Sequence, residues 1–165
     1  MKNLRLLKKL RIYKKRIGFT LIELLVVIAI ITLVSLISLV TIVNSRNRAK
    51  DARITADMSQ IRAVAKIIMI SEGGDYAKLS CSFEEMETLC DDIASQSSDK
   101  NHPIIVLSSD KKKYCAYKIL NSKKAGNVLY YCIDSAGRAE EVDFNPGDAG
   151  EGNCHSAGNI SCEPI

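Results

Sequence analysis

Neither glycine nor proline occurs between Phe19 and Glu72, so this stretch contains no ordinary helix breaker. Charged side chains are also missing from Leu24 to Val43, directly after the carboxylate of Glu23. Without glycine or proline, the sequence predicts no turn within this stretch. The absence of charge excludes a water-exposed helix over its first half, because a surface helix needs a polar face. Gly73-Gly74 supplies the first stop signal, and we predict one helix over residues 19–72.

The motifs of common enzymes are missing as well. The chain contains no G-x-S-x-G nucleophile turn, no phosphate-binding Walker loop and no H-E-x-x-H zinc motif. None of its six cysteines is spaced C-x-x-C, which argues against a zinc or redox site. His102 and His155 each lack a nucleophile or a carboxylate at motif spacing, and we interpret both as solvated or structural. The sequence therefore predicts no enzymatic activity and no cofactor.

Acidic residues are absent from the first 18 residues, which hold eight of the 23 basic side chains. Those eight are Lys2, Arg5, Lys8, Lys9, Arg11, Lys14, Lys15 and Arg16. Without them the chain would keep 15 basic against 19 acidic side chains, and its formal charge would move from +4 to −4. The basic balance thus belongs to this leader and gives no argument for nucleic-acid binding.

Residues 19–43 are predicted to span a membrane. At about 1.5 Å per residue they would form about 37 Å of helix, enough to cross a bilayer with some tilt. Eight cations precede the segment and four follow it, which places the N-terminus in the cytoplasm. Those four are Arg46, Arg48, Lys50 and Arg53. The segment is too long for a secretory signal, and no A-x-A cleavage pattern follows it. The rest of the chain should lie outside the cytoplasm, where its cysteines can form disulfides.

The boundary between the basic and apolar segments reads GFTLIE, from Gly18 to Glu23. A carboxylate near a bilayer core is costly unless it finds a partner. We predict that the partner of Glu23 is a new α-amino group, made by cleavage between Gly18 and Phe19. An ordinary signal anchor that happens to carry a glutamate is the alternative, and it leaves both Gly18 and Glu23 unexplained.

This boundary, followed by Leu24 and Leu25, resembles the class III leader of type IV pilins and of the pseudopilins of type II secretion. The resemblance implies cleavage after Gly18 by a membrane aspartyl peptidase, the prepilin peptidase, and methylation of the new N-terminus at Phe19. It also implies that Glu23 is used in packing one subunit against the next. Residues 46–68, RNRAKDARITADMSQIRAVAKII, resemble the later part of the pilin helix.

The resemblance implies a structural protein, a single-pass subunit of the cytoplasmic membrane that polymerises into a type IV pilus-like surface fibre. Its partners would be copies of itself, the prepilin peptidase, the pilus assembly machinery and the cytoplasmic membrane. A pseudopilin or minor pilin of a type II secretion or DNA-uptake system is the alternative within the class. A membrane-tethered extracytoplasmic binding module that never polymerises is the alternative of another class, and cleavage after Gly18 distinguishes it from a fibre subunit.

The predicted fold is α+β, a pilin-like lollipop with one long helix packed on a small antiparallel sheet. Its parts are a cleaved leader (1–18), a transmembrane or filament-core half-helix (19–43), an amphipathic half-helix (44–72) and an extracytoplasmic globular head (73–165). Ser82–Glu85 is a predicted capping box for a short helix that ends near Ala94. Strands are predicted over Ile104–Ser108, Lys113–Leu120, Val128–Ile133 and Arg138–Asp143. The apolar face of the sheet should cover the apolar stripe of the long helix.

The front half of the long helix departs from the pilin pattern at one position. Many pilins carry a proline near the position of Val40, where the helix loosens in the filament, and this chain has none. The segment offers instead four hydroxyls that can bond back to the helix, those of Thr32, Ser35, Ser38 and Thr41. Whether it melts on assembly stays open.

The cysteines lie at positions 81, 90, 115, 132, 154 and 162. A hairpin about the NSKKAGN turn would set Cys115 opposite Cys132, and a short flexible loop would join Cys154 to Cys162 and fix the C-terminal tail. Cys81 and Cys90 remain by elimination. On one helical axis, however, their Cα atoms would be over about 10 Å apart, beyond disulfide reach. Either the chain folds back before residue 82, or these two pair elsewhere.

Two further interpretations concern surface charges. Lys111–Lys113 and Lys123–Lys124 lie at predicted hairpin turns and could contact DNA phosphates, although such lysines more often solvate a turn or protect an edge strand. Four acidic residues could bind calcium through oxygen, as major pseudopilins do in their C-terminal region, but their spacing matches no loop motif. These four are Asp134, Asp143, Asp148 and Glu151.

Overall fold

The computed structural model describes residues 18–149, 154 and 160–164, and the chain divides into two compact units, residues 1–40 and 41–165. Helix α1 runs from Leu21 to Ser71. The second unit also contains helix α2 (Glu84–Gln96) and the strands β1 (Ile104–Leu107), β2 (Tyr114–Lys124), β3 (Asn127–Asp134) and β4 (Ala139–Val142). These elements confirm the predicted α+β class. The leader up to residue 17 lies outside the described residues.

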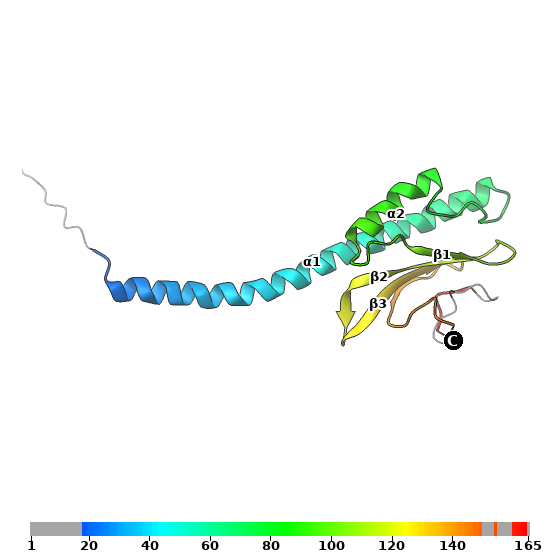
Figure 1. Ribbon diagram of the computed structural model, residues 1–165. Coiled ribbons are helices and arrows are strands. Elements are labelled where there is room, and N and C mark those ends of the chain that lie inside the picture. The colour runs from blue at the N-terminus through cyan, green and yellow to red at the C-terminus, as the bar shows by residue number, and fades with distance from the viewer. Residues whose placement is uncertain (1–17, 150–153, 155–159, 165) are drawn as a thin grey trace, which may run out of the picture. The chain divides into compact units, whose positions relative to one another are not determined.

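The four strands form one antiparallel sheet in the order β1-β2-β3-β4. Short connections join consecutive strands, so each strand lies beside its neighbour in sequence. All four predicted strands are present, and β2 extends beyond its predicted end at Leu120 to Lys124. Within the second unit, Figure 1 shows α2 and the later part of α1 on one side of the sheet and the end of the chain on the other.

Each face of the sheet carries its own core, because strand side chains alternate between the two faces. The first core joins α1, α2 and the sheet, and its fully buried members include Ile54, Met58, Ile61, Ala65, Met86, Ile93 and Ala116. The second core lies on the opposite face and contains Cys115, Tyr117, Cys132, Val142, Cys154, Ile160 and Cys162. The sheet therefore covers the apolar stripe of the long helix, as predicted.

Helix α1 ends where the sequence predicts. Gly73 and Gly74 have positive φ angles of 76° and 104°, which glycine adopts without steric cost. The N–H of Gly74 donates to the carbonyl of Met69 at 2.8 Å, which is the longer hydrogen bond of a Schellman cap. The two glycines therefore satisfy the end of the helix and turn the chain back toward α2.

Among the residues that the structure describes, no helix is both long and apolar enough to cross a membrane. The predicted span over residues 19–43 therefore stays a prediction. It includes residues 37–41, whose side chains lie outside the described part of the chain.

The start of α2 corrects one prediction and settles another. The N-cap is Phe83, which has no side-chain hydrogen bond to the helix, so the capping box predicted at Ser82–Glu85 is wrong. The N–H of Phe83 donates to the carbonyl of Ser80, so the chain turns just before the helix begins. That turn brings the Cα of Cys81 to 5.7 Å from that of Cys90, and the two are bonded. The pairing reached by elimination is thus confirmed, because the chain folds back ahead of α2.

The hairpin of β2 and β3 corrects the predicted Cys115–Cys132 bridge. Cys115 lies opposite Asp134, and Cys132 lies opposite Tyr117. The two cysteines are therefore diagonal neighbours on one face rather than direct partners. Diagonal positions in a sheet are about 7–8 Å apart at Cα, too far for a disulfide.

The Cys115–Cys132 bridge was predicted wrongly because the turn between β2 and β3 is shorter than expected. The strands continue through most of NSKKAGN, and only Ala125 and Gly126 form the connection, with φ angles of 51° and 88°. Two consecutive positive φ angles are typical of the tight turns that match strand twist. The register then shifts between Ile119 and Lys123, where β2 has a bulge.

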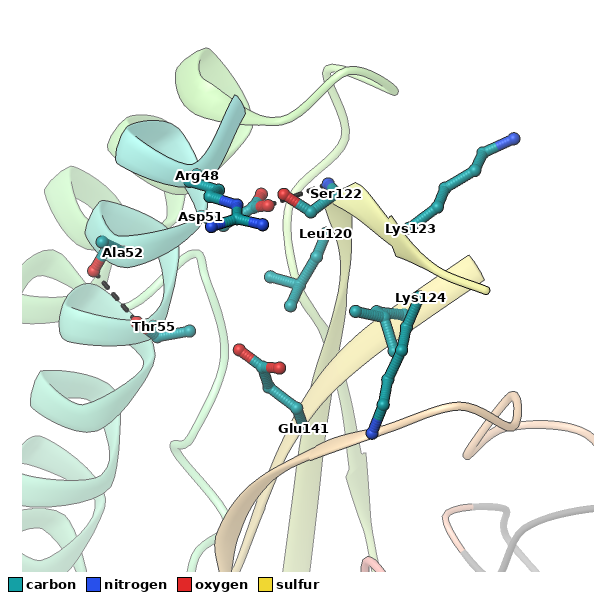
Figure 2. Close-up of a pocket in the computed structure, with 10 residues that line it drawn as sticks. Arg48, Asp51, Ala52, Thr55, Leu120, Ser122, Lys123, Lys124 and Glu141 are labelled. Carbon is teal, nitrogen blue, oxygen red and sulfur yellow. Dashed lines mark hydrogen bonds between the residues drawn. The ribbon is translucent and has the colours of Figure 1, made fainter. Parts of the chain in front are cut away.

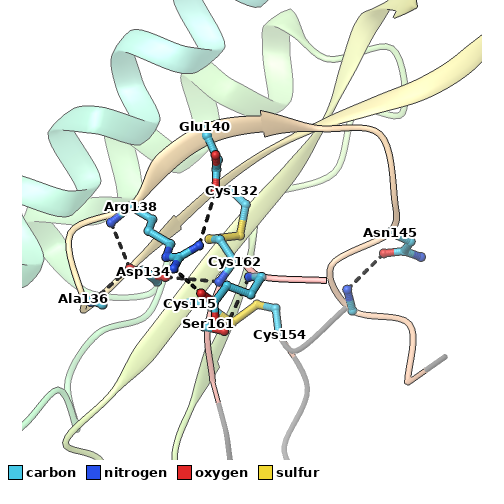
Figure 3. The surroundings of a disulfide bond; sticks show 12 residues. Cys115, Cys132, Asp134, Ala136, Arg138, Glu140, Asn145, Cys154, Ser161 and Cys162 are labelled. Atoms are coloured by element: carbon cyan, nitrogen blue, oxygen red, sulfur yellow. Dashed lines mark hydrogen bonds and ion pairs between the residues drawn. A yellow bond between two sulfur atoms is a disulfide. The ribbon is translucent and has the colours of Figure 1, made fainter. Parts of the chain in front are cut away.

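The tail is fixed by two disulfides to the two central strands. Cys115 is bonded to Cys154 and Cys132 to Cys162, with Cα–Cα distances of 5.8 and 5.7 Å. The predicted Cys154–Cys162 bridge is therefore wrong. Because Cys115 and Cys132 project from the same face, a tail that crosses this face can reach both (Figure 3).

Candidate functional site

The predicted cleavage position lies just before helix α1. Gly18, Phe19 and Thr20 are outside the helix, which begins at Leu21. Phe19 is 83% exposed, and a Cβ added at Gly18 would meet nothing within 4 Å. The peptide bond between Gly18 and Phe19 is therefore outside the helix, and the described residues do not crowd Gly18.

Glu23 already has a partner within its own chain. The N–H of Thr20 donates to Oε2 of Glu23 at 2.8 Å, and the Thr20 hydroxyl donates to the same oxygen at 2.8 Å. In return the N–H of Glu23 donates to the Thr20 hydroxyl at 3.3 Å. This reciprocal pair is a capping box that satisfies two N–H groups at the start of α1. Oε1 of Glu23 has no hydrogen-bond partner among the described residues.

This cap was not predicted, although its signal is present in the sequence. Thr20 and Glu23 have the T-x-x-E spacing that precedes an apolar run at many helix starts. The same motif was expected at Ser82, where the structure does not form it. Glu23 therefore has a local role in the helix, and the assembly role that the leader pattern predicts stays a prediction.

The helix that follows exposes its apolar side chains. Leu21, Ile22, Leu24 and Leu25 are 54–82% exposed, and the apolar side chains onward to Leu36 are similarly uncovered. An apolar surface of this size is normally covered by a membrane or by another protein. Two of the predicted back-bonding hydroxyls are also found. Thr32 donates to the carbonyl of Ile28 at 2.6 Å and Ser35 to that of Ile31 at 2.7 Å. The side chains of Ser38 and Thr41 lie outside the described part.

A comparison with protein families decides the nature of this segment. Residues 13–39 match the family model for the prokaryotic N-terminal methylation motif. The chain carries the class III leader of type IV pilins and pseudopilins. The matched residues include Gly18, Phe19 and Glu23, together with the exposed apolar helix. No curated protein and no solved structure matches the chain significantly.

The other predicted sites are not brought together. Asp134 is 1% exposed, and its carboxylate accepts the N–H groups of Ala136 and Arg138 at 3.0 Å and that of Cys162 at 3.1 Å (Figure 3). Its oxygens thus hold a turn and the tail. Over the described residues, no group of three or more His, Cys, Asp or Glu side chains is placed to hold a metal ion. Glu151, a predicted calcium ligand, lies outside them.

The two histidines and the two lysine clusters are also separate. His102 is exposed, with Nε2 2.9 Å from Oδ1 of Asp91, and His155 lies outside the described residues. The turn that carries Lys111–Lys113 is joined to the loop after α1, because the N–H of Tyr76 donates to the carbonyl of Lys111 at 2.8 Å. Lys123 and Lys124 instead line a cavity with Arg48 of α1. The lysines therefore do not form one surface.

A carboxyl pair between α1 and α2 was not predicted. Asp57 is only 8% exposed, and its Oδ2 has no hydrogen-bond partner among the residues that the structure describes. Burial, and then the neighbouring Asp92, raise the pKa of Asp57 to about 6. Asp92 behaves oppositely, because the hydrogen bond from Arg53 at 2.6 Å lowers its pKa. The burial of Asp57 becomes visible only once α2 is docked on α1.

Proposed function

We propose that this protein is a structural subunit of a type IV pilus-like filament. It is made as a precursor in the cytoplasmic membrane, cut between Gly18 and Phe19 and methylated on the new amine of Phe19. It then polymerises through its N-terminal helices, with Glu23 of one subunit pairing with the amine of the next. The observation that supports this most directly is the methylation motif at residues 13–39, placed at the start of a helix with exposed apolar side chains.

The exposed helix gives the driving force for the proposal. In the membrane its apolar side chains would contact lipid, and in a fibre they would contact other subunits, so either state removes them from water. Transfer of the helix from the membrane to the fibre therefore changes the buried apolar surface area little. The new amine and Glu23 then favour one arrangement of neighbours, because unpaired charges are costly where water is excluded.

The capping box makes this pairing consistent with the local structure. Both hydrogen bonds from Thr20 reach Oε2 of Glu23, so Oε1 is available for an amine of another subunit. The helix cap and the intermolecular pair can therefore exist together. Methylation of the amine keeps its positive charge, so it leaves the attraction in place.

The same motif also occurs in pseudopilins, which form shorter fibres, so this alternative is kept. A tethered binding module is less consistent with the motif, because a simple anchor needs no new amine. The folded part beyond residue 41 has a hydrophobic core on each face of its sheet and a tail held by disulfides. Disulfides are expected of a subunit that works outside the cytoplasm.

The test is to recover the protein from the surface of its native host and measure its intact mass and N-terminal sequence. We expect loss of residues 1–18, one added methyl group, and a chain that begins at Phe19. Sheared fibres should contain this form, and Gly18→Ala should be processed less well than the wild type. Surface protein that keeps its leader would contradict the proposal. Processed protein that is never found in fibres would favour the tethered module.

A further inference from the structure

A buried carboxylate attaches the β2–β3 hairpin to helix α1. Asp51 is 6% exposed, and it accepts the backbone N–H of Asn121 at 2.6 Å and that of Ser122 at 2.8 Å. The side-chain amide of Asn121 adds a third bond at 2.9 Å. These N–H groups are free to reach α1 because the register shift between Ile119 and Lys123 takes them out of the β-ladder.

Basic side chains of α1 and of the hairpin lie around this attachment. Arg48, Lys123 and Lys124 line a cavity of about 480 Å³ between α1 and the hairpin. Figure 2 shows Arg48 and Asp51 of α1 facing Ser122, with Lys123 projecting away from the sheet. All three cations are exposed, and within the described part of the chain none of them forms an ion pair.

The acidic groups of the cavity cancel this charge only in part, because two carboxylates line it against three cations. Of the two carboxylates that line it, Asp51 is fully engaged by backbone and amide N–H groups, and Glu141 is exposed on β4. A second hollow of about 400 Å³ adjoins the first, since Arg48, Ser122 and Lys123 line both. It adds the side-chain amides of Asn44 and Asn47, which can donate hydrogen bonds to an oxyanion.

The position of these residues along α1 indicates what they would meet. Arg48 follows the end of the predicted span at Val43 by five residues, about 7 Å of helix. The polar headgroup layer on each side of a bilayer is about 5–8 Å thick. If residues 19–43 occupy the hydrocarbon core, the cavity therefore lies at the level of the lipid phosphates.

We propose that this basic cleft, formed by Arg48, Lys123, Lys124 and the amides of Asn44 and Asn47, binds the phosphate of an anionic phospholipid while the subunit is stored in the membrane. The inference rests on the proposed function, because it requires the chain to be inserted through residues 19–43. Lipid is favoured over DNA because Asn44, Asn47 and Arg48 directly follow the predicted membrane segment in the sequence. The other lysine cluster, which a DNA surface would need, lies beyond the opposite end of α1, about 35 Å away.

The test uses the full processed protein, reconstituted in phosphatidylcholine bilayers, so that the cations of the leader do not contribute. Electron paramagnetic resonance measures the relative association of spin-labelled phosphatidylglycerol and spin-labelled phosphatidylcholine with the protein. We expect a preference for phosphatidylglycerol that weakens as salt is added. The double variant Lys123→Gln/Lys124→Gln should lose most of it, by up to about five-fold for each lysine.

The matched control is Lys112→Gln/Lys113→Gln, which removes the same charge from the other exposed hairpin turn. It should keep the preference for phosphatidylglycerol. An equal loss in the control, or no preference in the wild type, would overturn the inference. Binding of a labelled DNA duplex through Lys123 and Lys124, with no lipid preference, would overturn it in favour of a nucleic-acid partner.

Failure of the inference is distinguishable from failure of the proposed function. Protein that inserts and is processed but shows no lipid preference contradicts only the basic cleft. Protein that is recovered unprocessed, or outside the membrane fraction, contradicts the proposed function itself.

Discussion

At the scale of a single residue, Glu23 caps helix α1 and has a proposed second role in assembly, and its substitutions separate the two. Glu23→Gln keeps the capping box, since glutamine also accepts the N–H of Thr20, but removes the charge that would meet an amine. We expect the subunit to enter the membrane normally and fibre yield to fall by about tenfold or more, because an unpaired buried charge costs several kcal/mol. Electron microscopy and quantitation of sheared fibres measure the yield.

The control for this prediction is Thr20→Val, which removes the two hydrogen bonds of the hydroxyl, keeps the backbone N–H bond to Glu23 and leaves the charge. It should cost the helix start about 1 kcal/mol and leave fibre yield close to that of the wild type. If Glu23→Gln assembled normally and Thr20→Val did not, the carboxylate would act as a cap only.

Asp57 gives a pH dependence that can be measured. Its raised pKa, about 6, means that the folded protein keeps this proton at pH values where the unfolded chain, with the ordinary aspartate pKa of 3.8, has lost it. The free energy of unfolding should therefore fall as the pH rises from about 4 to about 6, and this contribution should stay constant above that range. Asp57→Asn should raise the free energy of unfolding at pH 7 by about 2 kcal/mol. Urea unfolding, followed by tyrosine absorbance across this pH range, tests the prediction.

Asp110 is a control of opposite sign. A hydrogen bond from Ser108 lowers its pKa, so its contribution is present at neutral pH and is lost as the pH falls. Asp110→Asn should therefore not raise stability at pH 7. If Asp57→Asn left the profile unchanged between pH 4 and 6, Asp57 would not be the titrating group.

At the scale of the elements, the disulfides give the sharpest test. Non-reducing peptide mapping should find Cys81 linked to Cys90, Cys115 to Cys154 and Cys132 to Cys162. A peptide that links Cys115 to Cys132 would show that the strand register is different. The bridge over 39 residues should stabilise the fold by about 4 kcal/mol and the one over nine residues by about 2.5 kcal/mol. Paired Cys→Ala variants compared by urea unfolding measure this order.

The elements also show where prediction from sequence ends. The long helix and its stop at Gly73-Gly74 follow from local chemistry, and so do the four strands with their β-branched and aromatic residues. The register of the central hairpin does not, because its bulge depends on Asp51, which lies 70 residues earlier than Asn121. The predicted Cys115–Cys132 bridge failed for the same reason, since two residues of register decide which cysteines meet.

In the candidate site, too, local sequence predicts some residues, and contacts between distant parts of the chain decide the others. Gly18, Phe19 and Glu23 were predicted because the leader chemistry lies in consecutive residues. The cap from Thr20 was within reach of the same local reasoning. Burial of Asp57 and the grouping of Arg48 with Lys123 require the docked structure, because α2 and the hairpin bring together residues that are distant in sequence.

For the whole molecule, processing should reverse the sign of the net charge. The full chain has a formal charge of +4 and a sequence pI of about 8.7, whereas the part after residue 18 carries 15 basic against 19 acidic side chains. Isoelectric focusing should therefore separate the precursor, on the basic side of neutrality, from the mature protein on the acidic side. Gly18→Ala should enrich the basic form. Surface protein with an isoelectric point above 7 would show that the leader remains attached.

The three disulfides all lie beyond residue 80, so no covalent cross-link joins α1 to the sheet. In a fibre built on α1, a pulling load would enter the folded region through the backbone after Gly73-Gly74 and through non-covalent contacts, chiefly the packing of Ile54, Met58 and Ile61 and the hydrogen bonds of Asp51 to the hairpin. The sheet and the tail, in contrast, are tied into one block by Cys115–Cys154 and Cys132–Cys162. A stretched fibre should therefore yield by peeling this block from the helix before any strand separates. Force spectroscopy of single fibres should give the same yield force with and without reductant.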